Sequence, residues 1–280
     1  GWFHGLMLGV VAPRPIAFVS TIDKAGQVNL SPYSFFNAFS ANPPVMIFSS
    51  ARRVRDNTTK HTLQNVLEVP EVVINIVNYA IVEQMSLSST EYDKGVNEFI
   101  KAGLTEAASD LVQPPRVAES PAAFECKVRE VIHLGEEGGA GNLVVCEVLR
   151  AHFREEILDA EQKIDPHKLD PVSRLGGNWY GRANTGLFEI DKPLSTKGIG
   201  VDQLPEAIRY STVLSGIKLG QLANVEQIPS PEAVAAFAER HPKKLQMPSL
   251  EEQHREAQAL LASGSVDEAW LTLLQPIQLL

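Results

Sequence analysis

The sequence predicts a mainly β fold, an antiparallel barrel with short helices, followed by a helical extension at the C-terminal end. Runs rich in β-branched and aromatic residues recur through residues 15–153. Short turn-forming stretches join several of these runs and few long helices separate them, which favours an antiparallel barrel over a doubly wound sheet. Helix-capping residues gather after about residue 200, and they predict the extension.

The first predicted hairpin pairs residues 15–22 with residues 28–36. Both runs are rich in β-formers, and the Asp-Lys-Ala-Gly stretch 23–26 between them has the chemistry of a tight turn. The Asn-Pro-Pro run 42–44 then breaks the chain. Residues 45–48 are uniformly apolar, and we expect a short buried strand there.

A change of period predicts a helix over residues 57–68, where three apolar side chains share one helical face. One of the three polar residues 56–58 is expected to cap its start, and Pro70 is expected to end it. A further strand is predicted at 72–77. Residues 80–118 are predicted to be irregular, with short helices.

Two long extended runs, 124–134 and 143–153, predict a second antiparallel hairpin, because the glycine-rich segment 135–142 connects them. The two cysteines of the chain, Cys126 and Cys146, fall in these apolar runs. We expect two buried thiols of a reducing compartment, and a disulfide between neighbouring strands is the less favoured alternative.

Three helix starts are predicted in the C-terminal extension. Ser230 precedes a proline at the first helical position, whereas Ser249 and Ser265 each have a glutamate three residues later, which is the capping-box pattern. Gly264 separates two helical stretches, so we expect a helical hairpin packed on itself or on the barrel. Residues 257–274 resemble half of a tetratricopeptide-type repeat, but a repeat array needs about three copies. The extension is therefore expected to be an appendage or dimer arm.

Composition limits the classes of function. The formal net charge of −9 and a pI of about 5.3 repel phosphate backbones, so we expect no nucleic-acid partner. No apolar run reaches the 18 residues that suggest a transmembrane helix, so no membrane partner is expected. The N-terminal residues lack the regions of a signal peptide, and a cytoplasmic location is the expectation.

Common catalytic signatures are missing from the sequence. It contains no Gly-x-Ser-x-Gly, no His-Glu-x-x-His, no phosphate loop ending in Gly-Lys-Ser/Thr and no Gly-x-Gly-x-x-Gly. The seven histidines are scattered without metal-ligand spacing, so no metal site is predicted. We assign no catalytic side chain.

The first of three polar stretches that could bind a ligand is the predicted strand 29–36. Hydroxyl and amide side chains alternate there with aromatic ones, which suits a planar ring that needs stacking and a few hydrogen bonds. Alternation puts Ser31 and Tyr33 on one face and Ser34 on the other. The alternative is a strand whose hydroxyls meet solvent.

The second stretch, Ser49–Thr62, gathers cations around a predicted helix start: Arg52, Arg53, Arg55 and Lys60. Amide groups and the helix dipole favour an anion there, so a phosphate is the candidate ligand and a solvated basic loop is the alternative. In the third stretch, Arg174 precedes two glycines that allow close approach of the backbone to a ligand. Arg174 could meet a carbonyl or a phosphate, and the alternative is a simple turn.

Taken together, these stretches resemble the flavin reductase-like, FMN-binding split-barrel family over roughly residues 11–182. Each motif is weak by itself, but their order is specific. The ordered set is Pro13–Thr21, Asn29–Asn37, Asn42–Pro44, Phe99–Thr105, Pro114–Val117, Glu119–Pro121, Phe124–Lys127 and Arg174–Gly177 with Tyr180.

The resemblance implies a Greek-key split β-barrel, usually a homodimer with the flavin near the subunit interface. By resemblance, Asn29, Ser31 and Ser34 line the isoalloxazine and ribityl chain. The phosphate end is held by Ser49, Ser50, Arg52, Lys60 and Thr62. The family often has Lys-Asp-Thr where this chain has Lys60-His61-Thr62. His61 could still donate to a phosphate, but the role of the aspartate is lost.

The function that we expect is an FMN-binding oxidoreductase, a flavin reductase that transfers hydride from NADH or NADPH to FMN. One alternative is a flavin-binding electron carrier without efficient nicotinamide turnover. Another is a scaffold that binds a partner, such as an electron-accepting protein, through its helical tail. The expected domains are the flavin reductase-like barrel over residues 1–200 and the helical extension over 201–280.

Overall fold

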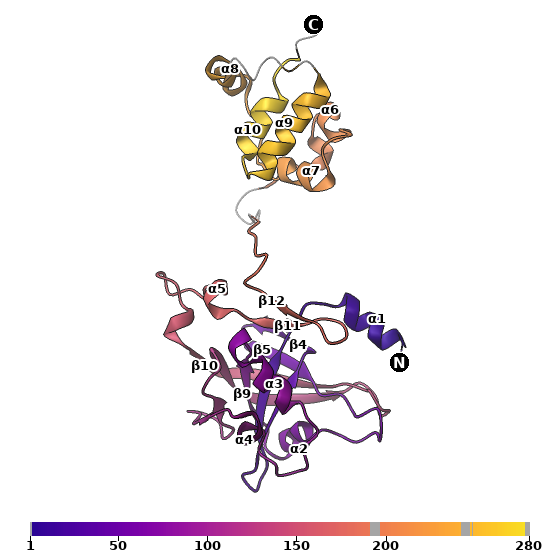
Figure 1. The fold of residues 1–280 in the computed structure, drawn as a ribbon, viewed down its shortest axis with the longest axis vertical. Helices are drawn as coiled ribbons and strands as arrows, with labels where there is room; N and C mark the ends of the chain where they lie inside the picture. Colours follow the sequence, from indigo (N-terminus) through magenta and orange to yellow (C-terminus); the bar gives the residue numbers. More distant parts are fainter. Residues whose placement is uncertain (1, 191–196, 242–246, 248, 278–280) are drawn as a thin grey trace. The chain divides into compact units, whose positions relative to one another are not determined.

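A computed structural model describes residues 2–190, 197–241, 247 and 249–277 of the chain (Figure 1). The chain divides into two compact units, Gly1–Phe188 and Glu189–Leu280. The predicted domain boundary at residue 200 stays a prediction.

The first unit is built on a seven-stranded antiparallel sheet with the strand order β3-β2-β6-β9-β10-β5-β4. Its members are β2 (Ala17–Ile22), β3 (Val28–Tyr33), β4 (Phe36–Ala41), β5 (Pro44–Ser49), β6 (Glu71–Ile76), β9 (Ala122–His133) and β10 (Asn142–Phe153). Two smaller sheets accompany it, β1 (Arg14–Pro15) with β11 (Val172–Arg174) and β12 (Tyr180–Arg182), and β7 (Glu106–Ala107) with β8 (Arg116–Val117). The predicted mainly β barrel is confirmed.

The connection between β3 and β4 shows why the large sheet closes on itself. These strands lie at the two ends of the strand order, yet only Ser34 and Phe35 separate them in the chain. Two residues span roughly 10 Å at most, so the sheet must curl until its edges approach each other. Among the described strands, β3 and β4 do not pair, and the barrel is therefore split along this line.

Both predicted hairpins are present, and one strand of the large sheet was missed. β2 pairs with β3 around the turn at Gly26, and β9 pairs with β10 along most of their length. Strand β4 was not predicted, because its sequence FNAFSA shows little alternation and nearly all of it is exposed. Cys126 and Cys146 are buried free thiols, as expected, and burial raises the pKa of Cys126 to about 12.

Short helices cover the barrel and complete two apolar cores. Alternate residues of β2 point to opposite sides of the sheet. Val19 therefore packs in one core with α2 (His61–Glu68). Phe18 packs in a second core with α3 (Val82–Ser88) and α4 (Glu98–Ala102). Helix α1 (Trp2–Val10) buries none of its side chains. The remaining helical segments of this unit are η1 (Tyr79–Ile81), η2 (Glu155–Ile157) and α5 (Pro166–Leu169).

The second unit has a helical core of its own. Its elements within the described residues are η3 (Val201–Gln203), α6 (Glu206–Arg209), α7 (Gly216–Ala223), α8 (Pro231–Arg240), α9 (Leu250–Ala262) and α10 (Val266–Leu273). Trp270 is buried in this core and donates its indole N–H to the carbonyl of Leu222 at 3.0 Å. The predicted hairpin of α9 and α10 packs on itself.

Two of the three predicted helix caps are confirmed in this unit. Ser230 accepts from the amide of Ala233, and Ser249 accepts from the amide of Glu252. Ser265 precedes α10 but makes no cap hydrogen bond with its side chain, so the second capping box is wrong. None of the helices in the described residues combines the length and the hydrophobicity that crossing a bilayer requires.

Candidate functional site

A small polar cavity of about 80 Å³ opens where β3, the start of α2 and the segment 88–92 meet, and we call it the β3–α2 hollow. Its walls come from segments far apart in the sequence. They are Asn29 and Ser31 of β3, Arg53, Lys60, His61 and Thr62, the segment from Ser88 to Tyr92, and Glu98 of α4. The hollow therefore joins the first predicted polar stretch to the second.

A hydrogen bond between two buried side chains joins β3 to α2. The amide nitrogen of Asn29 donates to the hydroxyl of Thr62 at 2.9 Å. Lys60 is the N-cap residue of α2 without a side-chain cap bond, and its Nζ lies 5.1 Å from the centroid of the Tyr33 ring. Since the first amides of a helix have no partner within the helix, this corner combines amide donors, a cation and an aromatic face.

Two ionisable groups of the hollow are shifted by their surroundings. Burial, followed by the nearby cations Arg53 and Lys94, lowers the pKa of His61. Burial raises the pKa of Glu98, whose carboxylate accepts from the amide of Leu30 at 2.9 Å. Glu98 thereby holds β3 at the point where Asn29 and Ser31 face the hollow.

Several predicted residues are used elsewhere. Ser34 follows the end of β3 at Tyr33, so the expected alternation stops before it, and it does not line the hollow. Arg52 donates from Nε to the Asn57 side chain and from Nη2 to the Asn57 carbonyl, both at 2.6 Å, which holds it in its own loop.

Ser49 and Ser50 also lie outside the hollow. Ser49 ends β5 and Ser50 follows it, and the amide of Ser50 donates to the carbonyl of Asn142, the first residue of β10, at 3.0 Å. The Ser50 hydroxyl and the Tyr33 hydroxyl are among the buried polar atoms of the described residues that have no hydrogen-bond partner.

Arg174 belongs to a different part of the first unit. It lies on β11, donates to the carbonyl of Gly177 at 2.9 Å and stacks over the Tyr180 ring at 4.5 Å. The structure does not bring it to the β3–α2 hollow. The third polar stretch is thus a turn whose arginine is held by its own neighbours.

Comparison with known proteins decides the family. The model of the flavin reductase like domain matches residues 10–168. The chain belongs to this family. An uncharacterized protein of Aquifex aeolicus is 40% identical over 180 residues, which are 64% of this chain and 89% of that relative. One of Halalkalibacterium halodurans is 40% identical over 192 residues, 68% of this chain and 90% of that relative.

Two solved structures extend the comparison to the fold. Component B of nitrilotriacetate monooxygenase from Bacillus cereus is 32% identical, with a TM-score of 0.63, and the match covers 67% of this chain and 92% of that one. The 2-nitrobenzoate 2-nitroreductase NbaA of Pseudomonas fluorescens is 30% identical, with a TM-score of 0.61 over 71% and 94% of the two chains. The family's Greek-key split β-barrel is thereby confirmed for this chain.

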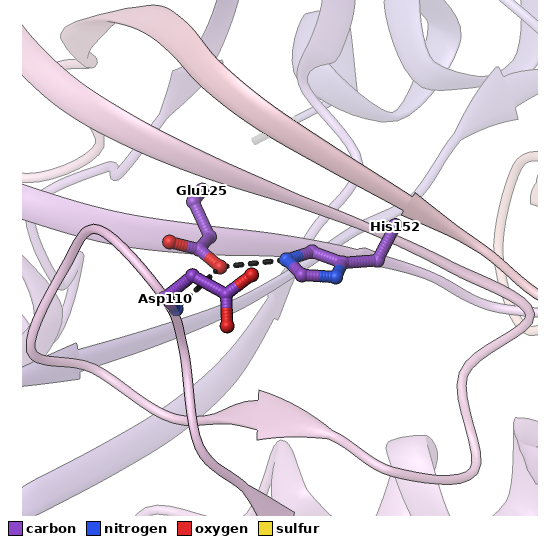
Figure 2. Close-up of side chains that lie close together, drawn as sticks. All are labelled: Asp110, Glu125 and His152. Atoms are coloured by element: carbon purple, nitrogen blue, oxygen red, sulfur yellow. Dashed lines mark hydrogen bonds and ion pairs between the residues drawn. The ribbon is translucent and has the colours of Figure 1, made fainter.

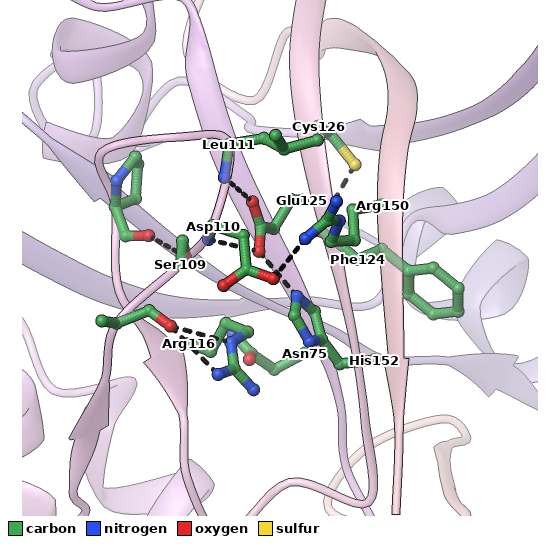
Figure 3. A network of polar contacts seen from close by, with 12 residues as sticks. Asn75, Ser109, Asp110, Leu111, Arg116, Phe124, Glu125, Cys126, Arg150 and His152 are labelled. Carbon is green, nitrogen blue, oxygen red and sulfur yellow. Dashed lines mark hydrogen bonds and ion pairs between the residues drawn. The ribbon is translucent and has the colours of Figure 1, made fainter.

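A second polar cluster of this flavin reductase-like domain joins β9 and β10 to the loop between β7 and β8. We call it the Glu125 cluster, and it consists of Asp110, Glu125, Arg150 and His152 (Figures 2 and 3). The buried Glu125 carboxylate accepts from the amides of Asp110 at 2.8 Å and Leu111 at 2.6 Å. His152 Nε2 lies 2.6 Å from Glu125 Oε1, and Arg150 donates to Asp110 at 2.6 Å.

Hydrogen bonds within the Glu125 cluster stabilise the ionised form of both carboxylates. Burial alone would raise the pKa of Glu125, but the amides of Asp110 and Leu111, with His152, outweigh it and hold the pKa below its usual value. The hydrogen bond from Arg150 lowers the pKa of Asp110. Asp110, Glu125 and His152 lie close enough to share a metal ion, but Arg150 already occupies the Asp110 carboxylate. The cluster thus fastens the segment around residue 110 to the sheet.

A larger cavity, of about 570 Å³, lies in the second unit between α8 and the end of α10. Its walls are almost entirely apolar, formed by residues such as Ile228, Val234 and Leu274. Because none of its described lining residues is a cation, these residues do not suit a phosphorylated ligand.

Proposed function

We propose that this chain binds FMN with its phosphate end in the β3–α2 hollow and acts as a flavin-dependent oxidoreductase. One observation carries the proposal: Asn29 and Ser31 of one strand share a cavity with Lys60, His61 and Thr62 at a helix start. Membership of the flavin reductase-like family supports the same ligand class.

The donors present fit the proposed ligand. Lys60 and the first amides of α2 would hold the phosphate, because a cation at a helix N-terminus is a ready anion site. Arg53, whose guanidinium already contacts Thr58, Thr59 and Glu91, would add its positive charge. Asn29 and Ser31 would receive the hydroxyl-bearing part of the ligand. Tyr33, whose ring lies next to Lys60, has a buried hydroxyl without a hydrogen-bond partner in the described residues. A bound ligand could supply that hydrogen bond.

A second copy of the chain is expected to complete the site. The hollow of about 80 Å³ is smaller than the roughly 300 Å³ or more that enclosed ligand sites provide. Next to the end of β3, the edge strand β4 is almost wholly exposed, and so are the apolar side chains of α1, including Trp2 and Phe3. We propose that these surfaces meet in a homodimer and cover the ring of the flavin.

The chemistry that FMN supplies when bound is hydride uptake and electron transfer. The residues of this chain bind the phosphate, orient the ring and, with a second copy, exclude water from it. No side-chain nucleophile or general base is needed for that task, which agrees with the absence of a catalytic signature. NADH or NADPH is the proposed reductant.

The purified full chain provides the test. We expect a visible spectrum with oxidised flavin bands that are released on denaturation, and oxidation of NADH or NADPH when FMN is added. Absence of FMN binding in a titration would reject the proposal. Retained flavin without nicotinamide oxidation would favour the electron carrier over the reductase.

A further inference from the structure

Glu91 places a negative charge at the site where a phosphate is proposed to bind. Its side chain lines the β3–α2 hollow together with Arg53 and Lys60. One carboxylate oxygen lies 3.4 Å from Arg53 Nε, and the other lies 3.1 Å from Arg55 Nη2. The carboxylate therefore bridges two cations of the second polar stretch.

Exposure shows that Glu91 stands at the mouth of the hollow. Thr62 is 1% exposed, and the side chain of Arg53 is 17% exposed. The side chain of Glu91 is 55% exposed, and that of Arg55 is 75% exposed. A ligand that continues toward solvent from a phosphate held at Lys60 and Thr62 passes the exposed wall of the hollow, which Ser89, Thr90 and Glu91 form.

The charges at this mouth suit a single terminal phosphate. Lys60 offers its charge to the first phosphate, whereas Glu91 pairs with both Arg53 and Arg55 and repels any further anionic group. Asp56 pairs with Arg55 at 3.4 Å and adds to the negative charge on this side. In the proposed pose a mononucleotide ends at the phosphate inside the hollow, whereas the second phosphate of a dinucleotide lies beyond it, on the side of Glu91.

We propose that Glu91 is a specificity-determining residue that makes the site prefer FMN to FAD. This inference rests on the proposed function, because it assumes that a flavin phosphate occupies the hollow. The competing explanation is that Glu91 only holds the segment 88–92 against the arginines. That role would affect all flavins equally, whereas selection by charge depends on the number of phosphates.

The test compares the dissociation constants of riboflavin, FMN and FAD in the full-length protein and in Glu91→Gln. We expect FMN to bind about twofold more tightly in the variant and FAD about fivefold more tightly, since exposed charge interactions are modest and the diphosphate passes closest to Glu91. Riboflavin affinity should not change. A charge-reversing variant, Glu91→Lys, should enlarge the gain for FAD, and high salt should reduce it.

Glu83→Gln serves as the matched control. It removes the same charge from an exposed residue of α3 that lies outside the hollow and lines a separate pocket beside Tyr79. An unchanged ratio of FMN to FAD affinity in Glu91→Gln, or an equal change in Glu83→Gln, would overturn the role of Glu91. A wild-type protein that binds FMN no better than riboflavin would overturn the phosphate subsite, and the inference with it.

Discussion

The Glu125 cluster and the β3–α2 hollow contain similar side chains but use them differently. In the Glu125 cluster, the buried carboxylate has two amides and a histidine as partners, and Asp110 has Arg150 (Figure 3). In the hollow, Lys60 faces a ring and the first amides of α2 border an open cavity. Charged groups that satisfy one another hold the fold together, whereas donors around an open cavity are available to a ligand.

The largest expected effect is on stability, at Glu125. Glu125→Ala leaves the amides of Asp110 and Leu111 without their acceptor and should lower the free energy of unfolding by about 3 kcal/mol. Chemical denaturation measures the loss. Glu147→Ala is the control, because its pair with Arg129 is solvent-exposed and its removal should cost much less. Equal losses in the two variants would show that the Glu125 cluster stabilises the fold no more than the Arg129–Glu147 ion pair does.

The second effect is on binding, at Lys60. Lys60→Ala should weaken FMN by about 30-fold, since a hydrogen bond to a charged group contributes roughly 2 kcal/mol. Riboflavin, which lacks the phosphate, should bind nearly as before, and so should both ligands in the exposed control Lys127→Ala. Flavin fluorescence titration gives the constants. An equal loss for FMN and riboflavin would reject the phosphate role of Lys60.

A smaller effect concerns pH, through His61. Burial and the cations around it lower the pKa of His61, so its ring is neutral at pH 7, but a bound phosphate favours the protonated ring. FMN affinity should therefore rise by about threefold as the pH falls below about 6.5.

The phosphate itself takes up a proton near pH 6, which opposes this gain. The comparison is therefore between wild type and His61→Asn at each pH. If the two proteins show the same pH dependence, His61 does not contact the phosphate.

The smallest effect is expected at Ser34, which the hollow does not include. Ser34→Ala should change FMN affinity by less than about threefold. If its hydroxyl instead contacts the flavin ring in a dimer, the visible spectrum of the bound flavin should shift. An unchanged affinity together with an unshifted spectrum would exclude the contact inferred from family resemblance.

The barrel could be predicted from the sequence because its hairpins carry local signals. Turn residues sit between β-rich runs, and Gly26 has the positive φ of 83° that such a turn needs. The start of α2 was misplaced, since residues 56–58 were expected to cap a helix that begins at His61. The Asp56 side chain instead accepts from the amide of Thr58. Asn57 has a left-handed backbone conformation, and its side-chain oxygen accepts from Arg52. The side chains that could have capped a helix therefore stabilise a loop.

Half of the hollow could not be predicted from local patterns. Local patterns of hydroxyl, amide and cationic side chains on a predicted strand and at a predicted helix start indicate one half as ligand contacts: Asn29, Ser31, Lys60 and Thr62. Ser88–Tyr92 and Glu98 come from a segment predicted to be irregular, and only tertiary packing carries them to β3. Arg174 is the opposite case. Its sequence context suggests a ligand contact, but in the structure its guanidinium interacts with Gly177 and Tyr180 instead.

The burial of Trp270 gives the two units different optical properties. Trp2 and Trp179 are largely exposed in the first unit, whereas Trp270 is enclosed in the helical core of the second. An enclosed indole emits at shorter wavelength than a hydrated one. A red shift of the intrinsic emission on heating would therefore follow the melting of the helical unit, even while the barrel retains its bound ligand.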